Sequence, residues 1–465
     1  MTTFPMTDFL LNYDVYPLVF PVGKEVTVHI RPTGGRPEFT PGKDYKVLIC
    51  AMNGGRPCDY PSSADYKELT LTCNSIGGFD VTHTYDSEQQ YFIRVLDVEG
   101  RRIQQFGVYA VDSDLAGRYP LRGDLHMHTN RSDGRQTPEV VSSMYRSHGY
   151  DFFAITDHHR YYPSIRAMEF FKDIPTEFVI VPGEEVHLPD VHGKSADAHI
   201  VNFGGEYSIN ALVKDEYFGE TGDSWVRAMP GVTPPDAKEL SDWEDMLEEL
   251  AEKTEVPEKV DKVPAAVMKW AFSEIKKAGG LAIFPHPCWI SDTLHVPDPF
   301  LEYIMENQDF DAFEVLGGER YFEHNGFQVV RYYEDKARGR RYPIVGSTDS
   351  HSSYESNEGA LICSTVVFSP ENERTALIKS IKDFYSVAFD TISTEFRIVG
   401  ENRLVRYACF LANYYFPRHD ELCREEGRLM RICATGTEEE KEDAIKQLSA
   451  INGRMKKFMD KYLAF

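Results

Sequence analysis

Short runs of alternating or continuous apolar residues follow one another through the first quarter of the chain. Such runs cover residues 25–30, 45–50, 69–73, 79–82 and 91–96. Turn sequences rich in glycine, proline and asparagine separate them, and no helical pattern intervenes. Strands at this spacing predict an all-β, sandwich-like N-terminal domain over residues 1–118. Two roles fit this domain: a substrate-binding module, or a module for packing or oligomerisation.

The pattern changes near residue 119, where apolar runs begin to alternate with helical stretches. The first helix is well marked, because Thr137 suits the N-cap, Pro138 the first helical position and Gly149 the stop. Runs with strand character cover residues 152–156, 178–181, 198–203, 281–284, 312–316 and 342–346. Strands that alternate with helices predict an α/β domain with a mostly parallel sheet. Their number favours a barrel over an open sheet, and we place this domain at residues 119–395.

Two segments depart from the alternation. Residues 205–270 are acidic and partly helical, and they fit either a solvated insertion or a lid over a site. Residues 396–465 form a helical C-terminal extension, because apolar residues recur at helical spacing. These residues are Leu404, Tyr407, Phe410 and Leu411.

Composition and charge limit the classes of partner. The chain has 465 residues, enough for two or three domains. Its net charge of −24, from 74 acidic and 50 basic residues, argues against a nucleic-acid partner. No apolar run approaches the roughly 18–20 residues of a membrane span, and the first residues lack the basic segment of a signal peptide. We therefore expect a cytoplasmic protein that does not bind membranes, with a homo-oligomer left open.

Side chains that bind metals cluster at the ends of the predicted strands. His126 and His128 share one side of an extended segment, because strand side chains alternate. In a barrel of strands and helices, the carboxyl ends of the strands converge on one mouth. The set that we expect there is His126, His128, Asp133, His158, Glu185, His199, His286, Asp349 and His351. His187 and His192 lie nearby without a decided role, and His295 and His324 are given none.

The number and kind of these side chains indicate the metal. One ion needs about three or four protein ligands if a position is left for water, so this set suits two or three ions. Imidazole and carboxylate without thiolate favour Zn, Mn or Fe over Ca or an iron–sulfur cluster. The sequence therefore predicts two or three divalent transition metals.

Taken together, the motifs resemble the PHP family, named for polymerase and histidinol phosphatase. The matching segments are 126–128, 132–134, 155–158, 182–185, 199–200, 284–287 and 347–351. They occur in the family's order and lie within about half of the chain. The resemblance implies a distorted (β/α)7 TIM-like barrel and the activity of a metal-dependent phosphoesterase.

The resemblance also implies how the ligands divide among the ions. The first ion would be held by His126, His128, Glu185 and Asp349. Glu185 would bridge to a second ion, held by His199 and His286. The third would be held by Asp133, His158 and His351, and Asp157 would orient His158.

Clustered divalent ions activate water and neutralise the charge that develops during phosphoester hydrolysis. Four basic residues close to the motifs could bind phosphate: Arg131, Arg160, Lys194 and Arg320. Catalytic roles are expected for Asp157, His159, Arg131 and Arg160. The main hypothesis is a phosphatase or phosphodiesterase that acts on a small molecule, a phosphate ester. The alternatives are a hydrolase that cleaves an amide, ester or glycosidic bond with the same metals, and a scaffold without activity.

Overall fold

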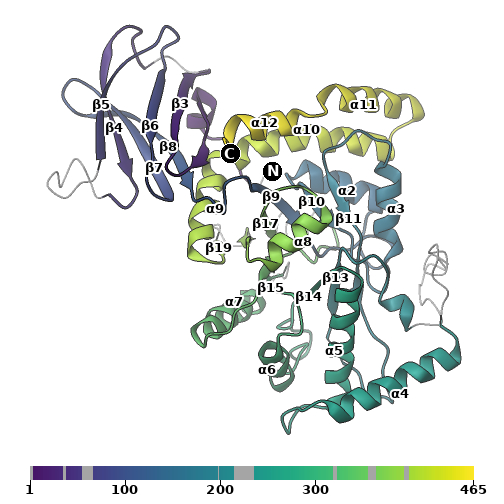
Figure 1. Cartoon of the computed structure of the whole chain (residues 1–465). Helices are drawn as coiled ribbons and strands as arrows, with labels where there is room; N and C mark the ends of the chain where they lie inside the picture. The colour runs from purple at the N-terminus through teal and green to yellow at the C-terminus, as the bar shows by residue number, and fades with distance from the viewer. Residues whose placement is uncertain are drawn as a thin grey trace. The chain divides into compact units, whose positions relative to one another are not determined.

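The computed structural model describes residues 4–34, 38–54, 66–196, 198–213, 235–317, 322–353, 363–391 and 397–465. The chain divides into two compact units (Figure 1). Unit 1 comprises Met1–Tyr119, Glu401–Leu422 and Gly453–Phe465, and unit 2 comprises Pro120–Gly400 and Cys423–Asn452. The domain boundaries expected near residues 118 and 395 stay a prediction. None of the helices in these described ranges has the length and apolar character needed to cross a membrane.

Unit 1 is built on two sheets. The smaller has the order β1-β3-β6 and the larger the order β2-β8-β7-β4-β5. The strands are β1 (Tyr13–Tyr16), β2 (Val19–Pro21), β3 (Glu25–Pro32), β4 (Asp44–Ala51), β5 (Tyr66–Thr72), β6 (Phe79–Thr84), β7 (Gln89–Leu96) and β8 (Arg102–Val111). The ring of Tyr45 on β4 lies 5.7 Å from the ring of Phe79 on β6, so side chains of the two sheets meet. The β-rich N-terminal region that the alternating pattern predicts is confirmed.

The helices of unit 1 are α1 (Asp8–Asn12), α9 (Asn402–Tyr414) and α12 (Arg454–Tyr462). Two apolar residues of α9, Tyr407 and Phe410, place their rings 4.9 Å and 5.4 Å from the ring of Tyr109 on β8. The helical character of the C-terminal region is therefore confirmed, and one apolar face of it covers the larger sheet.

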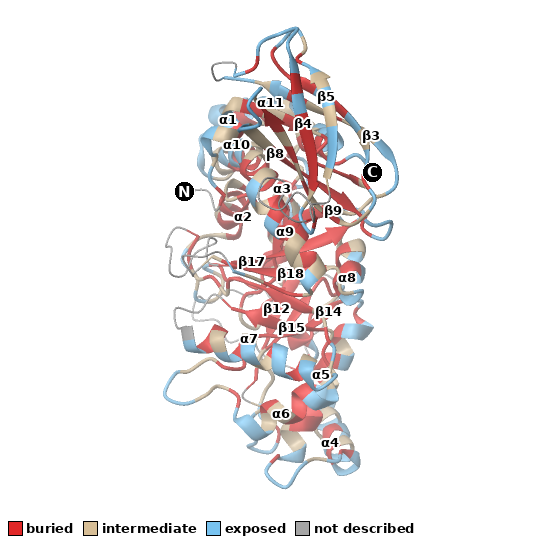
Figure 2. Cartoon of the chain, turned by 90° about the vertical axis from the view of Figure 1, so that its left-hand side faces the viewer, coloured by how far each residue is buried: buried red, intermediate tan, exposed pale blue. Residues whose placement is uncertain are grey.

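Unit 2 contains the strands that carry the candidate site. One sheet has the order β11-β10-β9-β17-β18-β19 and the other the order β12-β13-β14-β15-β16. The strands are β9 (Tyr119–Asp124), β10 (Phe152–Ala154), β11 (Val179–Val181), β12 (Gly183–Val186), β13 (Ile200–Phe203), β14 (Leu281–Phe284), β15 (Ala312–Leu316), β16 (Ile344–Gly346), β17 (Cys363–Ser369), β18 (Ser386–Asp390) and β19 (Arg397–Val399). Figure 2 shows that these strands are largely buried.

A closed (β/α)7 barrel is not confirmed, because the strands form two sheets. Strands β9, β10 and β11 are parallel, as are β14, β15 and β16, whereas β12, β13 and β14 pair antiparallel. In the described part of the chain, isolated bridges of Met127 with Ser350 and of His158 with Glu185 link segments of the two sheets. The physical reason is local: the residues that carry the polar site leave regular strand geometry just where a barrel would need to close.

Helices cover these sheets. They are α2 (Pro138–Ser147), α3 (Tyr162–Phe171), α4 (Ala237–Lys253), α5 (Lys262–Lys277), α6 (Asp298–Asn307), α7 (Phe322–Ala337), α8 (Arg374–Lys382), α10 (Phe416–Thr435) and α11 (Glu438–Ile451), with the 3-10 turn η1 (Asn210–Leu212). The boundary between the units falls within α10.

The acidic segment 205–270 contains α4 and the start of α5. A capping box of Asp236 and Glu239 begins α4, as an acidic residue three positions after the cap favours. Its buried residue Leu247 packs with Val191 and Val267, the latter on α5. The polar face of α4 is exposed (Figure 2). A role for this helix as a lid stays a prediction, and residues 214–234 lie outside the described part.

Candidate metal centre

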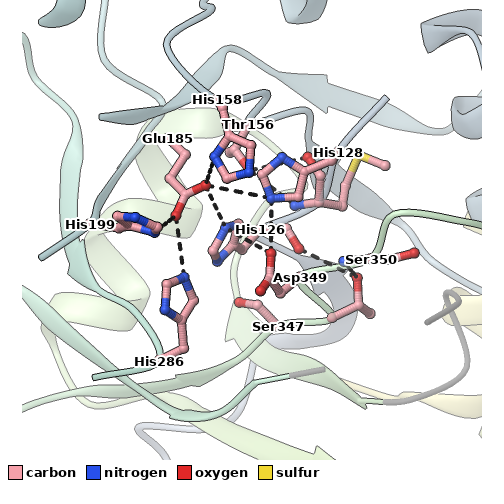
Figure 3. A network of polar contacts seen from close by, with 12 residues as sticks. His126, His128, Thr156, His158, Glu185, His199, His286, Ser347, Asp349 and Ser350 are labelled. Atoms are coloured by element: carbon pink, nitrogen blue, oxygen red, sulfur yellow. Dashed lines mark hydrogen bonds and ion pairs between the residues drawn. The ribbon is translucent and has the colours of Figure 1, made fainter. Parts of the chain in front are cut away.

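The carboxylate of Glu185 is the centre of the site and is completely buried. Glu185 lies on β12, and imidazoles approach both of its oxygens (Figure 3). Oε1 lies 2.7 Å from Nδ1 of His199 and 3.2 Å from Nε2 of His286. Oε2 lies 2.6 Å from Nδ1 of His158 and 3.6 Å from Nε2 of both His126 and His128. One carboxylate thus links histidines that are far apart in the sequence.

Asp349 is the centre of a second group of contacts, next to the group around Glu185. Its Oδ1 lies 2.9 Å from Nε2 of His128 and 3.3 Å from Nε2 of His126. The main chain supports this pairing, because the Asp349 amide donates to the carbonyl of His126 at 2.8 Å. Buried Asp124 strengthens the same junction by accepting hydrogen bonds from the amide and hydroxyl of Thr348.

A third group lies around Asp133. Its Oδ2 is 3.2 Å from Nε2 of His351 and 3.4 Å from Nε2 of His158, and its Oδ1 is 4.0 Å from Nδ1 of His128. The possible ligand atoms of these four residues all lie within 4.8 Å of one another. Asp133 is more than half exposed, so this group faces solvent while Glu185 does not.

The backbone is strained where the site residues leave their strands. His286 and Asp349 have φ values of 24° and 45°, and His159 has a φ of 60°. Residues with side chains rarely adopt positive φ, and such strain concentrates at functional sites. At His286 and Asp349, the unusual φ belongs to residues whose side chains contact Glu185 or its histidines.

Burial and neighbouring charges shift the pKa values of the site residues in opposite directions. Burial opposes the ionisation of Glu185, but the surrounding histidines, led by His158 and His199, outweigh it and hold its pKa well below the usual range. Burial lowers the pKa of His128 to about 3 and that of His199 to about 4. Burial also disfavours protonated His286, yet Glu185 and Asp349 raise its pKa to about 9. Ionised carboxylates and neutral imidazoles are the forms that bind metal ions.

Asp157 holds the loop that carries Asp133. Its carboxylate accepts hydrogen bonds from the Thr129 amide at 2.7 Å and from the hydroxyls of Thr129 and Ser132 at 2.6 Å each. Gly134 is needed in this loop, because a Cβ atom there would lie 2.6 Å from the carbonyl oxygen of His128. Asp157 therefore positions Asp133, in addition to preceding His158 in the chain.

The other residues expected in catalysis lie in different settings. His159 donates its amide to the carbonyl of Glu185 at 3.0 Å, and its ring lies 4.5 Å from that of His187. Arg160 is 4% exposed and Arg131 is half-buried. Lys194 forms an ion pair with Asp261 at 2.7 Å. Arg320 lies outside the described residues.

Three contributors were not predicted from the sequence. Glu314, within β15, is completely buried, and its Oε2 lies 3.1 Å from Nδ1 of His126. The sequence feature that could have drawn attention to Glu314 is a carboxylate inside the apolar run 312–316. The ring of His187 lies 3.8 Å from that of His199, and the ring of His295 lies 4.4 Å from it. His187 follows Glu185 at the spacing that puts two strand side chains on one side, whereas His295 gives no such signal.

The donor atoms fit divalent metal ions. Within the described ranges, four buried atoms of the site have ion-pair contacts such as those given above but no further hydrogen bond: Nε2 of His126, Nδ1 of His128, Nδ1 of His199 and Oε2 of Glu185. Buried polar atoms are normally satisfied, so their convergence needs an explanation. Close groups of possible ligand atoms also occur among His126, His128 and Glu185 and among His126, His286 and Asp349. Imidazole and carboxylate donors at this density suit transition metals.

Comparisons with known proteins were made with the sequence and with the structure. No protein-family model and no curated protein sequence matches the chain. Similar solved structures include a two-domain protein from Bacteroides vulgatus described as containing a predicted PHP-like metal-dependent phosphoesterase. It is 18% identical, with a TM-score of 0.40, over 62% of this chain and 69% of that one.

Two further structures cover about half of this chain. One is a putative metal-dependent phosphoesterase from Bifidobacterium adolescentis, 16% identical over 52% of this chain and 91% of that one, with a TM-score of 0.31. The other is an amidohydrolase from Chromobacterium violaceum, 17% identical over 51% of this chain and 89% of that one, also with a TM-score of 0.31. Of these three descriptions, the first uses the term PHP, the name of the family that the sequence motifs resemble.

Proposed function

We propose that the protein is a metal-dependent phosphoesterase that hydrolyses a small-molecule phosphate ester. The observation that supports this most directly is the buried carboxylate of Glu185, in contact with histidines from several strand ends. A carboxylate with so many imidazoles around it suits a bridging ligand between ions. The net charge of −24 disfavours a polynucleotide substrate.

The resemblance to the PHP family divides the ligands among three ions. His126, His128, Glu185 and Asp349 would hold one ion, Glu185 with His199 and His286 would hold a second, and Asp133, His158 and His351 would hold a third. Zn, Mn and Fe all suit these donors. The chemistry that such ions would supply when bound is activation of a water molecule and compensation of the charge that develops on the phosphoryl group.

Residues of the chain itself orient these groups and bind the substrate. Glu314 fixes the ring of His126, and Asp157 fixes the loop of Asp133. Arg131 and Arg160 bind the phosphate oxygens, since guanidinium groups recognise them in a bidentate manner. Hydrolysis adds the oxygen of water to phosphorus, breaks the P–O ester bond and gives a proton to the departing alcohol.

A substrate screen with measured metal content tests this proposal. Purified protein should carry two or more equivalents of metal per chain and release phosphate or an alcohol from phosphate mono- or diesters. Asp349→Ala should lower metal content and activity together, whereas Glu249→Ala on exposed α4 should change neither. Fewer than one equivalent after reconstitution would contradict the proposal. Metal-dependent cleavage of amides, carboxylic esters or glycosides, without action on phosphate esters, would favour the alternative hydrolase.

A further inference from the structure

The chain after His286 folds back on itself. The Trp289 amide donates to the carbonyl of His286 at 3.0 Å, and the His295 amide donates to the carbonyl of Trp289 at 2.7 Å. The Val296 amide closes the loop by donating to the carbonyl of Pro287 at 3.2 Å. This loop therefore returns His295 to the place where the chain left β14.

His295 faces the part of the site that contains His199 and His286. Its ring lies 4.4 Å from that of His199, nearly perpendicular to it, and 5.9 Å from that of His286. One ring nitrogen of each histidine can serve as a ligand atom, and these three atoms lie within 4.8 Å of one another. On another side, the ring of Trp289 lies 5.2 Å from that of His295. His199, just before β13, thus lies close to two histidines of the loop that follows β14.

The carboxylate of Glu185 lies beside two of these three imidazoles. Oε1 of Glu185 lies 2.7 Å from Nδ1 of His199 and 3.2 Å from Nε2 of His286. Nδ1 of His199 is buried and, apart from this ion-pair contact with Glu185, makes no hydrogen bond to any residue of the described ranges. Three imidazoles and one carboxylate can supply four protein donors to one ion, the number that zinc takes in its tightest sites.

We propose that His295 is a ligand of the ion held by Glu185, His199 and His286. This inference rests on the proposed metal-dependent function, in which only His199 and His286 join Glu185 at that position. With a fourth protein donor, this ion has as many protein ligands as the one assigned to His126, His128, Glu185 and Asp349, and it resists a chelator better than it would with three. His295 then determines the affinity and the metal preference of one position, independently of the group around Asp133.

Metal retention and the spectrum of bound cobalt test the role of His295. His295→Phe keeps a ring beside Trp289 but removes the donor nitrogen, whereas His295→Asp supplies an oxygen donor. His192→Phe is the matched control, because His192 is exposed and pairs with Glu248. Each protein is loaded with zinc or cobalt and dialysed against a series of chelator concentrations, and metal per chain is then measured.

We expect His295→Phe to lose one ion at a chelator concentration at least about tenfold lower than the wild type tolerates. Its visible cobalt spectrum should change as well, while His295→Asp recovers part of the retention and His192→Phe behaves as the wild type. If the wild type retains its ions and His295→Phe does so equally, with the same cobalt spectrum, the inference is wrong while the proposed function stands. A wild type that binds no metal would overturn both.

Discussion

Glu314 shows how a single side chain can prepare a metal ligand. Its carboxylate contacts Nδ1 of His126 and also accepts the amide of His286 at 3.2 Å. With Nδ1 engaged, the other nitrogen of His126 is directed at Glu185 and Asp349. Carboxylates behind ligating histidines fix the tautomer and the orientation of the ring.

Glu314→Gln should therefore weaken metal binding without unfolding the protein. We expect a loss of about 10–100-fold in affinity for the most affected ion, measured by competition with a chromophoric chelator. Glu323→Gln, on the exposed side of α7, is the control. Unchanged affinity in Glu314→Gln would mean that the contact with His126 does not orient it for metal.

Residue types and spacing predicted much of this site, but not its supporting residues. His126, His128, Glu185 and Asp349 follow a rule of position, since they lie at strand ends, and the structure brings them together. Glu314 lies inside an apolar strand, where its carboxylate marks an exception to the core pattern but does not indicate which residue it contacts. His295 approaches His199 through the folding of a loop, and such tertiary proximity has no local sequence signal.

At the scale of elements, alternation predicted strands and helices better than it predicted how the sheets close. The apolar runs 281–284 and 312–316 are strands as expected. A closed barrel would need continuous strand pairing between the segments of His158 and Glu185. The structure has a single isolated β-bridge between these two residues. Periodicity reports which side of a strand is buried, not which strand pairs with which, so the order of the sheets could not be obtained from it.

Helix α4 buries two of its side chains, Leu247 and Ala251. Leu247 is completely buried against Val191 and Val267, and the ring of Trp243 lies 5.4 Å from that of Trp270. Leu247→Ala should lower the free energy of unfolding by about 2–4 kcal/mol, because the truncated side chain leaves a cavity. Chemical denaturation measures this loss, and Glu249→Ala on the exposed face is the control.

The same variant tests whether α4 acts as a lid. If it does, Leu247→Ala should leave the metal content unchanged and alter the relative rates on small and large phosphate esters. Retained metals with an unaltered ranking of substrates would show that α4 is a solvated addition to the fold.

At the scale of the whole molecule, a buried ion pair joins segments of unit 2 that are far apart in sequence. Arg146 on α2 donates to Oε2 of Glu426 on α10 at 2.7 Å and to Oδ1 of Asp151 at 3.0 Å. Burial opposes the ionisation of Glu426. The charge of Arg146 and a hydrogen bond from Thr176 outweigh it and keep the pKa of Glu426 below its ordinary 4.5.

Glu426→Gln should destabilise the protein by about 3 kcal/mol near neutral pH, because Arg146 loses a charged partner in a buried position. The pKa of Glu426 is lowered by folding, so its contribution is fully present above about pH 4.5. That contribution is lost as pH falls through the lower folded pKa. Denaturation of both proteins from pH 7 to pH 3 should show the difference shrinking below about pH 4.5, and a constant difference would contradict this assignment.

Metal removal should affect unit 2 and spare unit 1, because every proposed ligand lies between Pro120 and Gly400. Without ions, the buried carboxylate of Glu185, the half-buried carboxylate of Asp349 and the imidazoles around them compensate one another's charge. Ligands that bind only the folded state stabilise it by about 4 kcal/mol at a thousandfold excess over Kd. Calorimetry with and without a chelator should therefore show the melting of unit 2 shifting down by several degrees, while a transition that belongs to unit 1 stays in place. Glu185→Gln, which removes the shared carboxylate, should already melt low and respond little to the chelator. Equal curves for the wild type with and without chelator, after loss of metal has been confirmed, would mean that the imidazoles and carboxylates compensate one another fully and that the ions serve chemistry without stabilising the fold.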